Sequence, residues 1–175
     1  MYSVVTGRFN NETLEANYLY RLKRNYQCIY CVPMELSPKI SYDSPVFVIE
    51  MNNSTNKIEG IGLIKNKPEV DRYYKVHTEG NTNRYIYIGN YFIDKATIER
   101  MNPLLITVLE EILFKGKTHS KRGSGLTLLP EKILKFEICK DVDIKKNIRD
   151  LFIIHFRKNT INDKILSGCD DIQDN

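Results

Sequence analysis

Apolar residues recur every three or four positions in three stretches of this chain, which is the spacing of one face of an α-helix. In the first stretch Leu14, Tyr18 and Leu22 follow this spacing, and Asn11 precedes them as a capping residue. Pro103 opens the second stretch, as proline does at the first position of a helix. The pattern predicts helices over residues 12–24, 103–115 and 143–158.

Runs rich in β-branched and aromatic residues predict the strands. They cover residues 3–9, 27–32, 46–51, 57–65, 72–77 and 84–93. The polar turn NNSTN joins the third and fourth runs, which predicts a β-hairpin. Gly60 and Gly62 in its second strand indicate a bulge or the close approach of another backbone. Glu50 and Glu59, one on each strand, are interpreted as a surface pair.

These elements follow one another as strand, helix, several strands and then helices. That order predicts an α+β fold with a curved mixed β-sheet or open barrel flanked by helices, rather than a doubly wound fold. The length of 175 residues fits a single domain, which we place at residues 1–160. Residues 161–175 are polar, and we expect them to form a flexible tail.

The net charge of +4 and the pI of about 8.8 are a mild basic excess, which favours a nucleic-acid partner only slightly. No secretory signal and no membrane-spanning run is seen, so we expect an intracellular protein, cytoplasmic or nuclear, with its four cysteines reduced. Abundant Asn, Ile, Lys and Tyr with no Trp indicate an AT-rich genome, such as that of a parasite or a large DNA virus. A viral protein would act in the host cell.

Cationic residues and glycines gather between positions 115 and 125, without an acidic residue among them. Gly116, Gly123 and Gly125 would let backbone N–H groups approach an oxyanion, and Ser120 and Ser124 add hydroxyl donors. This composition predicts a phosphate-binding loop. The alternative is a solvated loop that only keeps the protein in solution.

Several kinds of catalytic or metal site are not supported by the sequence. The GKT at 116–118 is not a P-loop, because Glu111 stands where that motif needs a glycine. Cys28 and Cys31 lie in a predicted strand, where residues three apart face opposite sides, and no second pair follows them to complete a zinc site. We therefore expect neither an enzyme nor a cofactor, a metal or a membrane partner.

Tyrosines are concentrated in the β-rich part of the chain, at positions 26, 30, 73, 74, 85, 87 and 91. Arg72, Lys75 and Arg84 are interleaved with them. Aromatic and cationic side chains together suit the stacking of nucleic-acid bases. Packing of these tyrosines within the sheet is the alternative.

Four segments resemble, in the same order, the YTH and EVE branch of the PUA-like superfamily. They are SVVTGRFNNETLEANYLYRL, CIYCVP, VFVIEMNNSTNKIEGIGLIKN and KRGSGLTLLPEKIL, which together span most of residues 3–136. The resemblance implies a PUA-like sheet with a pocket for one extruded base and a basic groove for the backbone. In YTH domains the pocket is an aromatic cage for adenine methylated on its exocyclic amine.

The resemblance also assigns individual residues. Tyr30 matches the first cage residue, and Tyr73 or Tyr74 lies where a second wall would stand. Lys121 and Arg122 match the stretch that contacts phosphate. The cages of the family are built from tryptophan, and this chain contains none.

The sequence therefore predicts a domain that binds RNA or single-stranded DNA, with the reading of a modified base such as methylated adenine as one form of that function. The predicted phosphate contacts are Arg8, Arg24, Lys117, His119, Ser120, Lys121, Arg122 and Ser124. The predicted base pocket comprises Tyr30, Asn52, Asn53, Tyr73 and Tyr74. The alternative is a non-catalytic structural or protein-interaction protein, viral in origin, whose helix at 143–158 docks on a partner through Leu151, Phe152 and Phe156.

Overall fold

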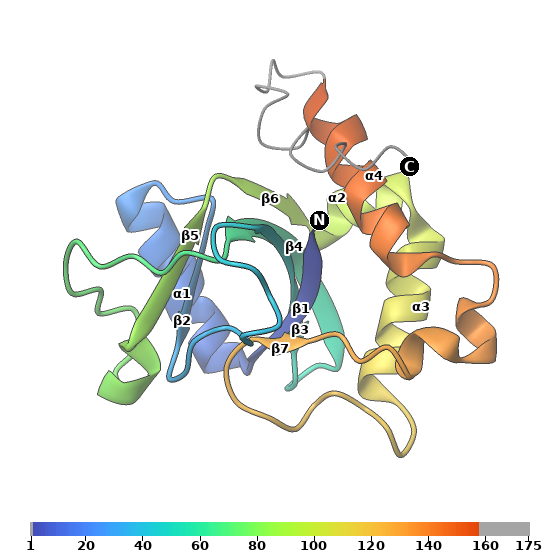
Figure 1. Cartoon of the computed structure of the whole chain (residues 1–175), viewed down its shortest axis with the longest axis horizontal. Helices are drawn as coiled ribbons and strands as arrows, with labels where there is room; N and C mark the ends of the chain where they lie inside the picture. The colour runs from blue at the N-terminus through green and yellow to red at the C-terminus, as the bar shows by residue number, and fades with distance from the viewer. Residues whose placement is uncertain (1, 158–175) are drawn as a thin grey trace.

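The structure of the chain, a computed structural model, describes residues 2–157 around a central mixed sheet of five strands (Figure 1). The strands are β1 (Ser3–Phe9), β3 (Pro45–Asn52), β4 (Lys57–Lys65), β6 (Tyr91–Asp94) and β7 (Thr127–Leu128). Their order across the sheet is β6-β4-β3-β1-β7, with β1 parallel to β3 and the other neighbours antiparallel. A separate antiparallel ribbon consists of β2 (Cys28–Val32) and β5 (Tyr85–Gly89).

Different elements cover the two faces of the central sheet (Figure 1). The helices are α1 (Asn11–Arg24), α2 (Lys95–Met101), α3 (Pro103–Phe114) and α4 (Ile144–Arg157), with 3₁₀ turns η1 (Gly80–Asn83), η2 (Ile133–Lys135) and η3 (Glu137–Cys139). On one face Phe47, Ile49 and Met51 of β3 pack in a core with α2, α3 and α4. On the other face Val46 and Val48 pack beneath the β2–β5 ribbon and α1. This alternation is that of a strand buried on both sides.

The fold is therefore α+β with a mixed sheet, as the order of elements predicts, and the sheet is not closed into a barrel. The three predicted helices are confirmed to within one residue at each end as α1, α3 and α4. The residue that caps α1 is Asn10 rather than Asn11. Its backbone is extended, and its side chain accepts a hydrogen bond from the N–H of Thr13 at 2.8 Å.

The predicted hairpin is confirmed as β3 and β4, and so is the bulge, whereas the close approach at Gly62 is that of a side chain rather than of another backbone. The register shifts between Glu50 and Met51, so that β4 carries an extra residue at Glu59. A Cβ atom on Gly62 would lie 2.1 Å from the hydroxyl of Tyr30. Glycine at this position is what allows the ribbon to pack so closely on the sheet.

Two strand predictions are wrong. Residues 72–77 form no strand, and the predicted strand 84–93 is divided by a bend at Asn90 into β5 and β6. These two strands belong to different sheets, because the chain crosses from the ribbon to the central sheet at the bend. Tyrosine-rich runs favour a half-buried pleated surface but do not determine which sheet provides it.

Three of the four cysteines, Cys28, Cys31 and Cys139, are buried and free. The fourth, Cys169, lies outside the described residues, as do the predicted tail at 161–175 and the domain boundary at residue 160.

Candidate functional site

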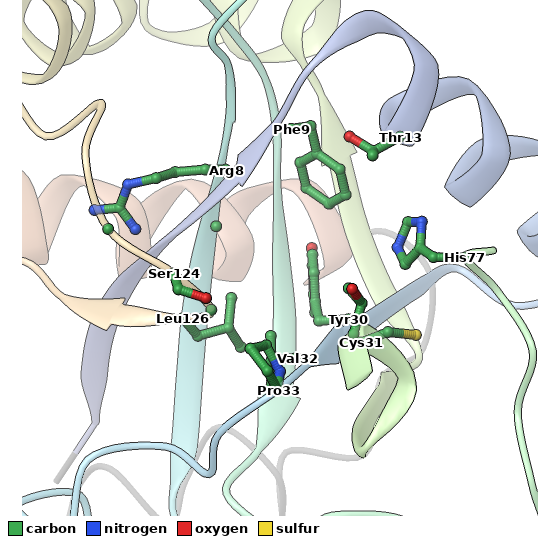
Figure 2. Close-up of a pocket in the computed structure, with 14 residues that line it drawn as sticks. Arg8, Phe9, Thr13, Tyr30, Cys31, Val32, Pro33, His77, Ser124 and Leu126 are labelled. Atoms are coloured by element: carbon green, nitrogen blue, oxygen red, sulfur yellow. The ribbon is translucent and has the colours of Figure 1, made fainter. Parts of the chain in front are cut away.

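A cavity of about 220 Å³ opens between β1, β2, the start of α1 and the glycine-rich loop, which we define as residues 115–125 (Figure 2). Its lining also includes residues from the segment between β4 and β5. In Figure 2 Arg8 and Ser124 lie on one side of the cavity. Phe9 and Tyr30 lie in the middle, and His77 lies on the far side. The site thus joins segments that are far apart in the sequence.

The middle of the cavity is aromatic and apolar. Phe9, Tyr30, Val32 and Leu126 belong to one buried cluster and are 8%, 1%, 4% and 9% exposed. Their positions are fixed by packing, so the floor of the cavity is preformed. Such a surface suits a planar ring, which gains contact area against aromatic and branched side chains.

Tyr30 is held in place from below by a buried ion pair. Its hydroxyl donates to Oε1 of Glu50 at 2.8 Å, and the same oxygen pairs with the guanidinium of Arg21. The guanidinium also lies over the ring of Phe92, 4.8 Å from its centroid. Burial and the Glu50 carboxylate raise the pKa of Tyr30 well above its ordinary value, so that the hydroxyl remains a donor.

This arrangement corrects the interpretation of Glu50 as a surface residue. Glu50 is 1% exposed, and on its face of β3 it lies beneath the ribbon. Burial lowers the pKa of Arg21, but the adjacent Glu50 carboxylate outweighs that effect and raises it. A buried carboxylate needs such a partner, because an unpaired charge in the interior is strongly unfavourable. In the sequence Arg21 is one of three basic residues near the end of α1, with Lys23 and Arg24, and nothing there indicates that it is buried.

The glycine-rich loop forms the near side of the cavity. Gly116, Gly123 and Gly125 have positive φ angles of 75°, 121° and 69°, which glycine adopts without strain. Within residues 2–157 the backbone N–H groups of residues 122–125 donate no hydrogen bond. Successive unpaired N–H groups are the donors from which concave anion sites are built.

Arg8 supports this loop from beneath. Its Nε donates to the carbonyl of Ser120 at 2.6 Å, and its Nη2 donates to Oγ1 of Thr127 at 2.9 Å. A Cβ atom on Gly123 would lie only 3.4 Å from Cζ of Arg8. Nη1 is buried without a partner in the described part of the chain, and burial lowers the pKa of the guanidinium. The loop therefore rests on a positive charge with spare hydrogen-bonding capacity.

The predicted phosphate-binding residues divide into four groups. Arg8 and Ser124 line the cavity. Outside the lining, but on the same loop, lie Lys117, His119, Lys121 and Arg122. Ser120 is buried, and its backbone anchors the loop to Leu113 as well as to Arg8. Arg24 is remote, because it ends α1 about 17 Å along the helix axis from Thr13, which lines the cavity.

Of the predicted stacking tyrosines, Tyr30 lines the cavity and the other two do not. Tyr73 is 67% exposed. Tyr74 is 2% exposed, and its hydroxyl donates to Oδ1 of Asp71 at 2.8 Å. The structure therefore brings one of these tyrosines to the glycine-rich loop and pairs it with Phe9 rather than with a second tyrosine.

The two asparagines of the hairpin turn also lie outside the cavity lining. Asn52 donates to Glu59 at 2.8 Å and to Asn11 at 3.0 Å, so that its amide links the turn to α1. Asn53 donates to the carbonyl of Lys121 at 3.0 Å. Both side chains hold neighbouring segments together, and Asn53 fixes the glycine-rich loop.

His77 and Thr82 are lining residues that the sequence did not indicate. The segment that carries them is fixed by Asn83, which is 3% exposed. The Asn83 side chain accepts from the N–H of His77 at 3.0 Å and donates to its carbonyl at 2.7 Å. Burial lowers the pKa of His77. The sequence predicts a strand at 72–77, which ends at His77, but that prediction does not bring the segment to the cavity; only the folded structure places it there.

A second hollow of about 290 Å³ lies across the loop from the first one. The two hollows share Ser124, Gly125 and Leu126 as a common wall. Met34 and Lys39 line the second hollow, and both are exposed. The surface beside the loop can therefore accommodate more than one ligand group.

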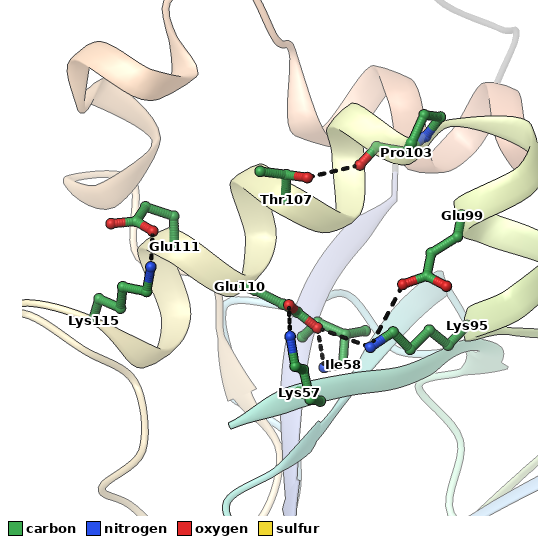
Figure 3. Close-up of polar contacts among 9 residues, drawn as sticks. All are labelled: Lys57, Ile58, Lys95, Glu99, Pro103, Thr107, Glu110, Glu111 and Lys115. Atoms are coloured by element: carbon green, nitrogen blue, oxygen red, sulfur yellow. Dashed lines mark hydrogen bonds and ion pairs between the residues drawn. The ribbon is translucent and has the colours of Figure 1, made fainter. Parts of the chain in front are cut away.

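A cluster of charged residues around Glu110 lies on another part of the molecule (Figure 3). Its carboxylate accepts from Nζ of Lys57 at 3.0 Å, from the N–H of Ile58 at 3.1 Å and from Nζ of Lys95 at 3.3 Å. These bonds satisfy the carboxylate and fasten α3 to β4 and to the start of α2. The cluster is structural.

Within residues 2–157 no group of three or more His, Cys, Asp or Glu residues could hold a metal ion. None of the helices in that range combines the length and apolar character needed to cross a bilayer. In comparisons with known proteins, no family model, no curated protein and no solved structure matches the chain.

Proposed function

We propose that this protein binds single-stranded nucleic acid, RNA or DNA, by holding one base in the cavity and the adjoining phosphate at the glycine-rich loop. One observation carries the proposal: a preformed aromatic cavity opens directly beside a loop whose N–H groups are unpaired and which rests on Arg8. A nucleotide has the matching parts, a flat ring and an anion, joined in one molecule.

The loop supports the phosphate half of the proposal. Gly123, Ser124 and Gly125 line the cavity, and their unpaired N–H groups and the exposed hydroxyl of Ser124 are available as donors. Arg8 contributes positive charge beneath them, where partial burial weakens screening by solvent. Lys121 and Arg122 lie beside the mouth and would contact the phosphates of neighbouring nucleotides.

The cavity supports the base half of the proposal. Its volume of about 220 Å³ is below the range of about 300–1,000 Å³ that is usual for drug-sized ligands, which favours a single ring system. A PUA-like pocket of the YTH and EVE type requires aromatic contacts with the base. Phe9, which is 8% exposed, supplies aromatic surface, and Tyr30, which is 1% exposed, packs in the same cluster as buried support. We propose that architecture for this chain, with methylated adenine as one base to be tested.

The second hollow favours a strand over a free nucleotide. A chain that placed its base in the first cavity would cross Ser124 and Gly125 and continue into the second hollow, which is lined by Lys39 and by the exposed carboxylate of Glu35. A mononucleotide would leave this adjoining surface empty.

The cavity supports binding rather than catalysis. Cys31 is the cysteine in the cavity lining, and burial raises the pKa of its thiol to about 12. It is therefore a thiol and not a reactive thiolate at neutral pH. The alternative of a protein-docking α4 is not favoured, because Leu151 and Phe152 are 4% and 0% exposed in the protein's own core.

The proposal is tested by titrating labelled single strands of RNA and DNA while fluorescence anisotropy is recorded. Affinity should fall steeply between about 50 and 200 mM salt, and each phosphate contact removed should reduce the log–log slope by about 0.7. The double variant Lys121→Gln with Arg122→Gln should show a smaller log–log salt slope than the wild type. The matched double variant Lys132→Gln with Lys135→Gln removes two exposed cations near η2 and should leave the slope unchanged. Salt-independent affinity, or equal slopes in the two variants, would contradict the proposal.

A further inference from the structure

The imidazole of His77 is the polar group that faces the glycine-rich loop from the opposite side of the cavity (Figure 2). It is partly buried, and within residues 2–157 its side chain makes no hydrogen bond. The aromatic floor formed by Phe9 and Tyr30 lies between His77 and the loop. A ring resting on that floor with its phosphate at the loop would direct its outer edge toward His77.

The backbone that carries this imidazole is held in place by the protein. The Asn83 amide bonds the backbone of His77 on both sides, accepting from its N–H and donating to its carbonyl. Asn83 also accepts from the N–H of Val76 at 3.1 Å and donates to the carbonyl of Glu79 at 3.2 Å. The buried Asn83 side chain therefore holds the segment around His77, which belongs to no helix or strand. Such fixation is what a group needs if it is to discriminate between ligands.

We infer that His77 is the specificity-determining residue of this site, and that it selects the base by a hydrogen bond to the base edge. This inference rests on the proposed binding of single-stranded nucleic acid. A neutral imidazole offers one donor and one acceptor, and the hydroxyls of Thr13 and Thr82 lie in the same lining. A base that matches these groups retains its hydrogen bonds, whereas one that does not leaves them unpaired.

The low pKa of His77 agrees with a neutral ring, because burial disfavours the charged form and outweighs the nearby Glu79 carboxylate. Leaving one such group unpaired against the wrong base should weaken binding about tenfold. The preference should therefore be measurable as a ratio of dissociation constants, separately from the phosphate contacts that all bases share.

The experiment uses four short single strands that are abasic except for one base, which is A, C, G or U. The wild-type protein should bind one or two of them about tenfold more tightly than the others. His77→Phe keeps a ring but removes the hydrogen bonds, and it should bring the four dissociation constants to within about twofold without changing the salt slope. His77→Gln keeps a donor and an acceptor and should retain part of the preference. His155→Phe on α4, across the central sheet, is the matched control and should bind like the wild type.

The outcomes separate this inference from the function on which it rests. Equal affinities of the wild type for all four strands, or a preference that persists in His77→Phe, would overturn the role of His77 while leaving nucleic-acid binding intact. Failure of every strand to bind would overturn both.

Discussion

Glu50 is the residue on which the floor of the cavity depends. It lies 1% exposed on β3, pairs with Arg21 from α1 and accepts the hydroxyl hydrogen bond of Tyr30. Three elements thus meet at one carboxylate. Because Arg21 is also buried, neither charge has water as an alternative partner, and removal of one leaves the other uncompensated.

The variant Glu50→Gln should therefore destabilise the fold by about 3–5 kcal/mol, measured by urea denaturation. Glutamine keeps an acceptor for Tyr30 but leaves Arg21 as an unpaired buried cation. Combining it with Arg21→Met should give a loss smaller than the sum of the two single losses, because both remove the same pair.

Glu137→Gln is the matched control, since the Glu137 side chain is 88% exposed in its pair with Lys140. It should change stability by less than about 0.5 kcal/mol. A Glu50→Gln variant as stable as this control would show that the ion pair is not an important contributor.

The helices and the hairpin are the elements that the sequence predicted well, because their signals are local. The proline at position 103 and the polar turn between β3 and β4 each act within a few residues. The spacing of Leu14, Tyr18 and Leu22 predicted α1 correctly but not its buried face, because Tyr18 and Leu22 are 57% and 61% exposed and the buried residues are Asn17 and Arg21. Where a prediction required knowledge of a distant partner, it was wrong. The run at 84–93 was predicted as one strand, but its two halves pair with β2 and β4 respectively.

The junction between α3, α2 and β4 shows an element-level contribution that depends on pH. Burial alone would raise the pKa of Glu110, but hydrogen bonds from Lys57, the Ile58 N–H and Lys95 outweigh it and lower the pKa below 4.5 (Figure 3). Below that value the unfolded chain binds the proton more readily than the folded one. The stabilisation is therefore present above pH 4.5 and is lost as the pH falls.

Glu110→Gln should lower the unfolding free energy by about 1 kcal/mol or less at neutral pH, since Lys57 is half exposed. Urea unfolding at a series of pH values should show a smaller acid-induced loss in this variant than in the wild type. Parallel pH profiles would indicate that Glu110 does not fasten α3 to β4.

At the scale of the whole molecule, the cavity could be predicted only in part. The glycine-rich loop was predicted from its composition, and Tyr30 from the family resemblance of its segment. Both signals lie within a single short stretch of sequence. His77 and Phe9 were missed, because a histidine in an irregular segment and a phenylalanine ending a strand give no sign that they will meet. Asn52 and Asn53 were assigned to the pocket, and the structure places their amides in bonds that hold α1 and the loop.

The two faces of the central sheet divide the molecule into parts with different roles. The face under α2, α3 and α4 is a continuous apolar core. The other face carries the buried ion pair, the ribbon and the cavity, whose polar lining groups come from β1, α1, β2, the segment between β4 and β5 and the glycine-rich loop. The proposed binding function therefore belongs to the second face alone.

Whether the cavity binds nucleic acid is tested by heteronuclear NMR. Spectra of the isotope-labelled protein are recorded while a single-stranded oligonucleotide is added. The amide signals that shift should be those of residues 7–9, 30–33, 77–82 and 122–126, whereas signals from α3 and α4 should remain in place. Absence of any shift, or shifts centred on α3 and α4, would contradict the assignment of the cavity as a nucleic-acid site.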